Sequence, residues 1–306
     1  WGRALNTFVS SAEYGRNLLE FASVGCQVTN YMFDGGTNFA HWGASRILTA
    51  YESNYPVREG GLLSDKYYRL KPVNEFITQF GSFLADSSEE VGAPGFTVPT
   101  DSRLVVRCNE AGRILFCSDS GIRPRMPLSL PNGEALDVSM PTIRGLALPY
   151  EFKIKKDSVI DYANVGLLGF AAGSAQLLLW GVAGTMAVIS INGERITVMI
   201  PAAEVLQLTI GGTILCLMDE TMADRAWHLT DRMIFGADLA HDGEMKCSAG
   251  SPRLQELSAQ GKLSFLNNPL IAPLPILPPL VNWSASLSPE PAGAGPGWTG
   301  IPGPCS

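Results

Sequence analysis

The sequence has no uninterrupted apolar run approaching the roughly 20 residues that a membrane-spanning helix needs, so we expect no membrane span. It also has no block of like charges, and its formal net charge is −7. An acidic chain without a basic patch has nothing to neutralise phosphates, so we expect no nucleic-acid partner. Residues 1–23 lack the apolar stretch of a signal peptide, and the first residue is Trp1 rather than Met, so the sequence leaves the localisation unknown.

The six cysteines form no Cys-x-x-Cys pair, and the three histidines are far apart in the sequence. We therefore expect no metal site. Cys108 and Cys117 lie in adjacent β-like stretches and could face each other across a hairpin. Separate reduced thiols in the core are the favoured interpretation, because disulfides depend on compartment and spacing.

Apolar spacing predicts two helices near the start of the chain. The first covers residues 4–22 and ends before Gly25, and the second starts at Ser64-Asp65, a plausible N-cap pair, and continues to Leu84. Pro72 is expected to kink the second helix or to begin a new segment. A short strand, Gln27–Phe33, lies between them, so the order is that of a βα unit. One strand cannot form a parallel sheet, and its partners must lie elsewhere.

From about residue 96 the pattern changes to short β-rich stretches separated by turns. Asn192-Gly193 is a strong signal for a type I′ hairpin, and Gly211-Gly212 marks a second turn. Strands at this spacing without helices between them predict an antiparallel sandwich or open barrel. The expected strands are Arg103–Cys108, Ile114–Ser118, Ile143–Leu148, Gln176–Trp180, Met186–Ile191, Glu194–Ile200, Val205–Ile210 and Thr213–Met218.

The last 40 residues, 267–306, are dominated by Pro, Gly, Ala and Ser. Such a segment cannot bury enough apolar surface to hold one conformation, so we interpret it as a disordered linker or tail. A Pro-rich ligand for another protein is the alternative.

The stretch Thr29–Ala44 is the most informative about function. It contains the end of the expected strand, the glycine pair Gly35-Gly36, and then polar and aromatic residues. Gly-Gly lets the backbone approach a ligand closely. The rings of Tyr31, Phe39 and Trp42 would suit a sugar, although an aromatic-rich core segment has the same composition.

These residues carry a resemblance. Asn30–Ala44 closely resembles the signature of the β-galactosidases of glycoside hydrolase family 35, Tyr-Met-Phe-x-Gly-Gly-Thr-Asn-Phe. Trp1-Gly2 is similar to the end of that family's Asp-His-Trp-Gly segment, Thr49–Pro56 to a following loop, and Asp65–Leu70 to its Glu-Lys-Tyr-x-x-Leu helix. The four motifs occur in the family's order.

The resemblance implies that residues 1–90 are the end of a (β/α)8 (TIM-type) barrel. The strand pattern predicts a β-sandwich in residues 96–235, and the composition predicts a linker with the Pro/Gly-rich tail in residues 236–306. The fold class is thus an α/β remnant followed by mostly antiparallel β structure. We expect the β-rich part to close a core of its own.

The resemblance also implies a retaining hydrolase of terminal β-galactosyl groups that works with two glutamates and no cofactor. Both glutamates would precede residue 1, so no catalytic residue is assigned and the chain alone is expected to be inactive. Asp34, Glu52 and Glu59 are poor substitutes, because a working pair needs a fixed separation and different pKa values.

What remains is part of a sugar pocket, to which we assign Tyr31, Asn38, Trp42 and Tyr51 as substrate-binding residues, with packing as a competing role for Tyr51. Ser53 stands where the family has a tyrosine that contacts galactose, so the sugar and aglycone specificity stay open. The partner is a galactoside or another carbohydrate. The alternative to a hydrolase is a truncated, non-catalytic carbohydrate-binding or scaffolding protein.

Overall fold

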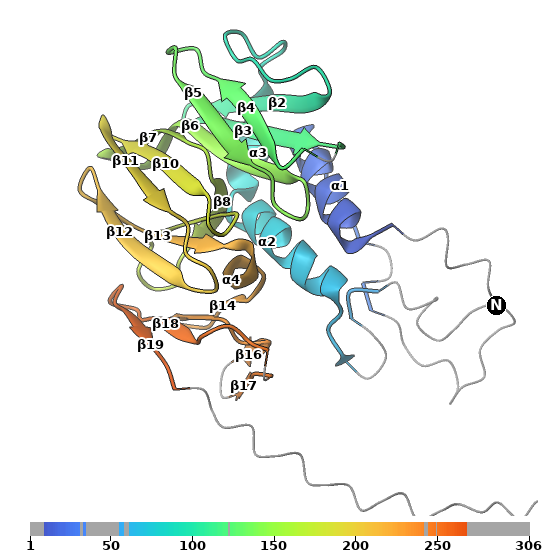
Figure 1. Ribbon diagram of the computed structural model, residues 1–306, viewed down its shortest axis with the longest axis vertical. Coiled ribbons are helices and arrows are strands. Elements are labelled where there is room, and N and C mark those ends of the chain that lie inside the picture. Colours follow the sequence, from blue (N-terminus) through green and yellow to red (C-terminus); the bar gives the residue numbers. More distant parts are fainter. Residues whose placement is uncertain are drawn as a thin grey trace, which may run out of the picture. The chain divides into compact units, whose positions relative to one another are not determined.

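A computed structural model describes residues 9–30, 33–34, 55–57, 61–121, 123–241, 244–248 and 250–267. These residues form mostly antiparallel β sheets with few helices (Figure 1). No described helix has both the length and the apolar character that crossing a bilayer requires.

Helix α1, Ser11–Ser23, begins later than the apolar spacing predicts. Ser10, the residue before the helix, has an extended backbone conformation. Its side chain accepts a hydrogen bond from the Glu13 amide at 3.1 Å and so caps the helix. Gly25 follows the helix with φ +76°, as predicted for a glycine at a helix end. Leu18 and Leu19 are buried against the rest of the chain.

Helix α2, Asp65–Gln79, continues through Pro72, so no new segment begins there; a kink at Pro72 stays a prediction. Pro72 cannot donate to the preceding turn, but its ring is buried and packing offsets the lost bond. The break comes at Phe80 (φ −104°, ψ 18°), which separates α2 from the short helix α3, Gly81–Asp86.

The expected strand at residues 27–33 is not formed in its described part. Gln27–Asn30 pair with no other strand among the residues that the structure describes. Asp34 makes a single parallel bridge to Val57, and Val57 an antiparallel bridge to Leu63. The barrel unit therefore stays a prediction.

The largest sheet has the order β1-β2-β3-β6-β7-β10-β11, with antiparallel neighbours throughout. Its strands are Ser88–Glu89, Ser102–Asn109, Gly112–Asp119, Gly145–Lys155, Ser158–Ala163, Met186–Ile191 and Glu194–Met199. The hairpin between the last two is confirmed, because Asn192 and Gly193 have φ +51° and +78° as a type I′ turn requires.

A second sheet has the order β12-β13-β9-β8 (Val205–Ile210, Thr213–Asp219, Leu177–Gly181, Gly166–Phe170). The turn between β12 and β13 is confirmed at Gly211-Gly212, where both φ angles are positive. β13 pairs with β9 in parallel, an exception in a fold that is mostly antiparallel, as predicted. Because β9 and β13 are not consecutive in the chain, no local signal could reveal this pairing.

The described residues of 236–267 include four strands, β16–β19, and are not the linker that the sequence predicts. A third sheet, β14-β15-β18-β19 (Ala226–His228, Met233–Phe235, Gln255–Leu257, Leu263–Phe265), follows the short helix α4, Glu220–Asp224. Two hairpins complete the described strands: β16-β17 (Leu239–His241, Glu244–Lys246) and β4-β5 (Arg125–Ser129, Ala135–Ser139). Three-residue strands carry too little periodicity to be recognised in the sequence.

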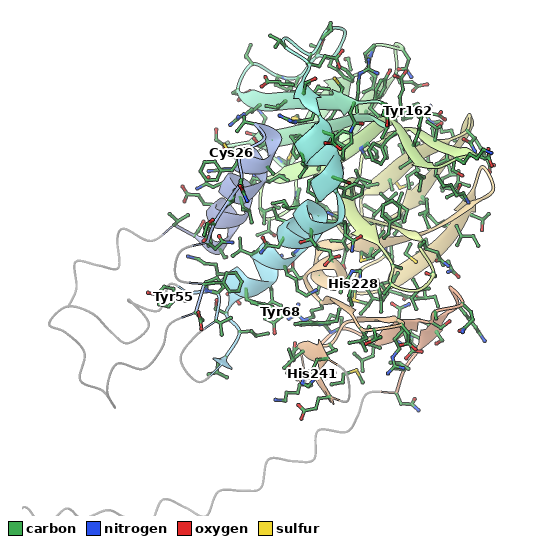
Figure 2. All side chains as sticks on the ribbon, turned by 180° about the vertical axis from the view of Figure 1, so that it is seen from behind. Cys26, Tyr55, Tyr68, Tyr162, His228 and His241 are labelled. Carbon is green, nitrogen blue, oxygen red and sulfur yellow. The ribbon has the colours of Figure 1, made fainter. Side chains whose placement is uncertain are left out.

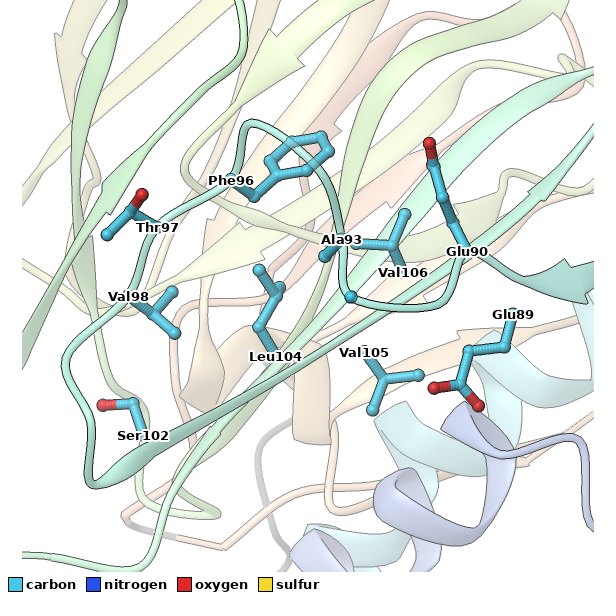
Figure 3. A pocket seen from close by; sticks show the side chains of 11 residues that line it. Glu89, Glu90, Ala93, Phe96, Thr97, Val98, Ser102, Leu104, Val105 and Val106 are labelled. Atoms are coloured by element: carbon cyan, nitrogen blue, oxygen red, sulfur yellow. The ribbon is translucent and has the colours of Figure 1, made fainter.

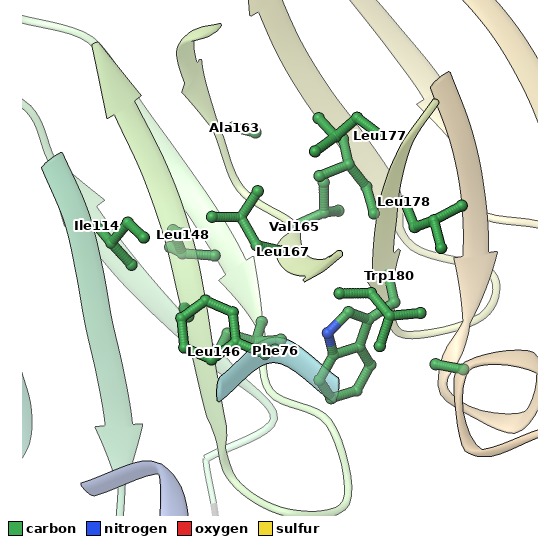
Figure 4. Close-up of a cluster of buried hydrophobic side chains, with 14 of the residues drawn as sticks. Phe76, Ile114, Leu146, Leu148, Ala163, Val165, Leu167, Leu177, Leu178 and Trp180 are labelled. Carbon is green, nitrogen blue, oxygen red and sulfur yellow. The ribbon is translucent and has the colours of Figure 1, made fainter. Parts of the chain in front are cut away.

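The main core joins the helices to both large sheets. Phe76 of α2 lies among Leu146, Leu148 and Trp180 from the sheets (Figure 4), and its ring is 5.8 Å from that of Phe116. The β-rich part thus shares its core with the helices, whereas its turn pattern predicts a core of its own. The described residues, which lie between positions 9 and 267, belong to one compact unit.

The cysteines in the described residues are free. β2 and β3 do form the expected hairpin, but its register places Cys108 opposite Arg113 and Cys117 opposite Leu104. The two thiols therefore do not face each other. Burial raises the pKa of the Cys117 thiol to about 12, which leaves it unreactive in the core.

We predict that Gly112→Ala lowers the free energy of unfolding by about 2–4 kcal/mol. Gly112 has φ +125°, and a Cβ there would overlap the carbonyl oxygen of Glu151 on the facing strand. Gly133→Ala is the matched control, since Gly133 has φ +87° but open space around its Cβ position, and should cost only about 1 kcal/mol. Equal losses in urea unfolding for the two variants would contradict this packing constraint.

Candidate functional site

The four residues assigned to the sugar pocket, Tyr31, Asn38, Trp42 and Tyr51, lie outside the described residues. The structure does describe the residues on either side of this motif segment. The described part of the site is its frame, which we define as the short stretches Phe33–Asp34 and Tyr55–Val57 together with the helices that hold them.

Phe33–Asp34 and Tyr55–Val57 lie side by side. The Val57 amide donates to the Phe33 carbonyl oxygen at 3.1 Å, and Asp34 and Val57 form a parallel bridge. The two ends of the segment 35–54 are thus joined by backbone hydrogen bonding. Such joined ends are typical of loops that carry function on a rigid support.

Ser64 ties this frame to the start of α2. Its hydroxyl donates to the carbonyl oxygens of Tyr55 at 2.8 Å and Pro56 at 3.0 Å, and its amide donates to Pro56 at 2.9 Å. Ser64 does precede the helix as predicted, but its side chain makes no capping bond to α2. The hydroxyl holds the loop instead of the helix end.

On the other side, Asn30 is held by α1. The Tyr14 hydroxyl donates to Oδ1 of Asn30 at 2.9 Å, and the Lys66 ammonium lies 4.9 Å from the centre of the Tyr14 ring. Burial raises the pKa of Tyr14 and lowers the pKa of Lys66. Asn30 and Lys66 belong to the recognised motifs, whereas Tyr14 carries no sequence signal and was missed.

An aromatic chain connects the frame to the third sheet. The rings of Phe33 and Tyr67 meet edge to face at 6.1 Å between centroids, and Tyr67 stacks on Trp227 of β14 at 6.3 Å. The Tyr68 hydroxyl donates to the Asp238 carbonyl oxygen at 2.8 Å. The start of α2 therefore positions the frame against residues more than 150 positions away.

In the middle of α2, Arg69 pairs with two acidic side chains of α4. Arg69 Nη1 lies 2.7 Å from Asp224 Oδ2 and 3.4 Å from Glu220 Oε2. Glu220 also accepts hydrogen bonds from the Thr142 amide and hydroxyl at 2.8 and 2.9 Å. Burial raises the pKa of Asp224 to about 7, although the Arg69 guanidinium acts in the opposite direction.

Nearly two turns further along α2, a second polar group meets β14. Nε2 of His228 lies 2.7 Å from Oε1 of Glu75, which also accepts from Gln79 at 3.0 Å, and Figure 2 places His228 beside this helix. Burial alone would raise the pKa of Glu75, but His228 and Gln79 lower it. Burial lowers the pKa of Lys71 to about 8, and its ammonium lies 4.5 Å from the centre of the Trp227 ring. These groups fix α2 to the β-rich part.

The hollow beside β2 does not hold a catalytic carboxylate pair. It encloses about 360 Å³ between the loop after β1 and the apolar face of β2, and Glu89 and Glu90 at its rim point in different directions (Figure 3). Glu90 accepts a hydrogen bond from Nε of Arg113 at 2.8 Å, and this contact raises the pKa of the guanidinium. Glu90 therefore forms an ion pair with Arg113. A retaining pair needs two carboxyl groups about 5–5.5 Å apart that face one substrate.

Comparison with known proteins finds matches for the first quarter of the chain. Residues 1–77 match the family model of glycosyl hydrolases family 35. Over 78 residues the chain is 37% identical to the Beta-galactosidase of Bos taurus, 36% to that of Felis catus and 33% to that of Homo sapiens. The alignment covers 24% of this chain in each case, and 12%, 12% and 11% of the respective relatives. The chain thus matches only about an eighth of the length of these relatives.

The buried Asp224 predicts a pH-dependent stability. A carboxyl whose pKa rises from 3.8 to about 7 on folding stabilises the folded state fully below pH 3.8, and this contribution is lost as the pH rises through 7. Asp224→Asn should therefore flatten the fall in unfolding free energy between about pH 4 and 7. The difference between the two proteins over that window is at most about 4 kcal/mol.

Urea unfolding at several pH values measures this difference. Asp137→Asn is the matched control, because Asp137 also pairs with an arginine, Arg125 at 3.0 Å, but its side chain is 54% exposed. A wild-type pH slope that Asp224→Asn leaves unchanged would show that Asp224 is ionised in the folded protein at these pH values.

Proposed function

Because residues 1–77 are a portion of a glycosyl hydrolase of family 35, we propose that the chain is part of a retaining β-galactosidase that acts on terminal β-galactosyl groups. In this proposal, both catalytic glutamates precede residue 1 in the parent protein. The chain supplies the last unit of the barrel, one side of the sugar pocket, and the β-rich part that supports them.

The proposal rests on contacts that hold both ends of residues 31–54, the segment with most of the family's motif residues. Asn30 is held by Tyr14 of α1, and the far end of the segment is held at Tyr55 and Pro56 by Ser64, the residue before α2. A sugar pocket needs side chains in a fixed geometry, and the contacts of Asn30, Tyr55 and Pro56 with the helices give the segment two fixed ends.

Within this frame the proposed substrate-binding residues are Tyr31, Asn38, Trp42 and Tyr51. Tyr31 directly follows the anchored Asn30, and Tyr51 lies four residues before the anchored Tyr55. Tyrosine and tryptophan rings can stack on the apolar face of a sugar, while hydroxyl and amide groups bond its hydroxyls. No cofactor is needed, because this hydrolysis uses carboxylates and water.

We predict that the chain alone does not hydrolyse aryl β-galactosides, since removing the catalytic pair of a glycosidase forfeits orders of magnitude in rate. The measurement is release of the aryl alcohol against a buffer blank, with the bovine relative assayed alongside as the positive control. Turnover above the blank that disappears in Asp34→Asn would place the chemistry inside this chain and contradict the proposal.

In a full-length parent protein, Tyr31→Phe should lower kcat/KM by about 5- to 30-fold, equivalent to about 1–2 kcal/mol, if its hydroxyl bonds the sugar or orients the nucleophile. The melting temperature should barely change, because the ring is kept. Tyr162→Phe, in the buried strand β7, is the control and should leave the kinetics unchanged. Unaltered kinetics in Tyr31→Phe together with a clear loss of stability would make Tyr31 a packing residue.

A further inference from the structure

Strand β11, Glu194–Met199, forms one end of the seven-stranded sheet (Figure 1). Among the described residues it pairs with β10 alone. The two-residue turn Asn192-Gly193 decides which residues bond to β10: every second one, starting at Glu194. The intervening residues direct their backbone N–H and C=O groups toward the open edge of the sheet. These intervening residues are Arg195, Thr197 and Met199.

The two faces of β11 differ in their surroundings. Its three outward-bonding residues are exposed, and Met199, which is 59% exposed, lies opposite Met186 of β10, which is 48% exposed. On the other face, Ile196 and Val198 are half-buried and pack against the core. β11 thus combines an apolar inner face and an exposed outer face with a backbone edge to which no described strand is paired.

The neighbouring edge of the second sheet is blocked, in contrast to that of β11. The Gln255 side chain accepts from the Val205 amide at 2.6 Å and donates to the Val205 carbonyl oxygen at 3.0 Å, so it occupies the edge of β12. β1, at the far end of the seven-stranded sheet, has only two residues and offers little edge. β11 has six residues, contains neither Pro nor Lys, and pairs with β10 without a bulge. An edge strand without these protections is a template for pairing with another chain.

The sequence of β11 is complementary to a second copy of itself. In an antiparallel pair with a two-fold axis at Thr197, this threonine lies opposite its own copy, and Ile196 lies opposite Val198 on the apolar face. Both kinds of pair stabilise facing strands. Arg195 then lies opposite Met199, so its apolar stem covers the exposed methionine and no like charges meet. Moving the axis to Ile196 would press the Glu194 carboxylate against Val198, which costs desolvation.

We propose that β11 is the contact surface for a second copy of this chain, with which it forms one continuous antiparallel sheet about a two-fold axis at Thr197. Because this contact uses the same strand on both sides, it closes on itself and gives dimers rather than longer assemblies. One strand on each side is a small interface, below about 1,200 Å², so we expect a dissociation constant of about 10–100 μM. The proposed function does not enter this inference.

Analytical ultracentrifugation of the full chain between about 1 and 500 μM measures the association. We expect the average mass to rise with concentration from 32.8 kDa toward twice this value. Thr197→Lys should hold the mass at the monomer value throughout, because two ammonium groups would face each other across the axis. Thr209→Lys is the matched control: Thr209 is an exposed threonine of β12, whose edge Gln255 blocks, so this variant should associate like the wild type.

Cysteine substitution at the axis tests the register by a gain of signal. Facing residues of a hydrogen-bonded antiparallel pair have Cα atoms about 5.5 Å apart, which a disulfide can bridge. Under mild oxidation at a concentration that favours the dimer, Thr197→Cys should form a disulfide between two copies at position 197, identified by mass spectrometry. Thr209→Cys should not, and the wild type, which has the exposed Cys26, gives the background of cross-linking.

Three results would overturn the proposal. The chain could stay monomeric over the whole concentration range, or Thr197→Lys could associate as strongly as the wild type, which would place the contact on another surface. Thr197→Cys could also cross-link no more than Thr209→Cys, which would exclude a two-fold axis at this position. Urea unfolding at about 1 μM checks that each variant is folded, and the cross-linking arm decides the matter if Thr197→Lys is not.

Discussion

The structure depends on the burial of helix α2, in which five residues are buried and most of the others are half-buried. Only Asp65 and Thr78 of this helix are exposed, and Leu70 and Phe76 are almost completely buried. Full burial of one such side chain contributes about 1.5–3 kcal/mol, so the helix supplies a large share of the marginal stability of a domain. Its apolar side holds the two large sheets together, and its start holds the third sheet through Tyr67 and Trp227.

Because α2 is surrounded, its polar side chains need partners inside the protein. Arg69 meets Asp224 and Glu220, and Glu75 meets His228. These pairs connect the segment that matches family 35 with β-rich residues that do not match it. The α2 start, fixed in this way, carries Ser64 and Lys66 to the frame of the motif segment. The support of the proposed sugar site thus reaches into the β-rich part.

Much of this fold follows from local sequence signals. Strands Met186–Ile191 and Val205–Ile210 begin and end as predicted, because alternating apolar residues between clear turns define both. The parallel β9–β13 pairing and the passage of α2 through Pro72 depend on tertiary packing, which no local pattern contains. The motifs predict where the site lies, but the contact of Tyr14 with Asn30 joins residues 16 apart without any shared pattern.

The central claim is that residues 9–77, which lie in the segment that matches family 35, and the β-rich part unfold as one cooperative unit. Native-state amide hydrogen exchange tests it most directly, by comparing Leu70 and Phe76 of α2 with Leu115 and Leu148 of the large sheet. The account predicts that these amides exchange through openings of the same free energy, equal to that of global unfolding. Exchange of the α2 amides through an opening at least about 2 kcal/mol less costly than that of the sheet would contradict it.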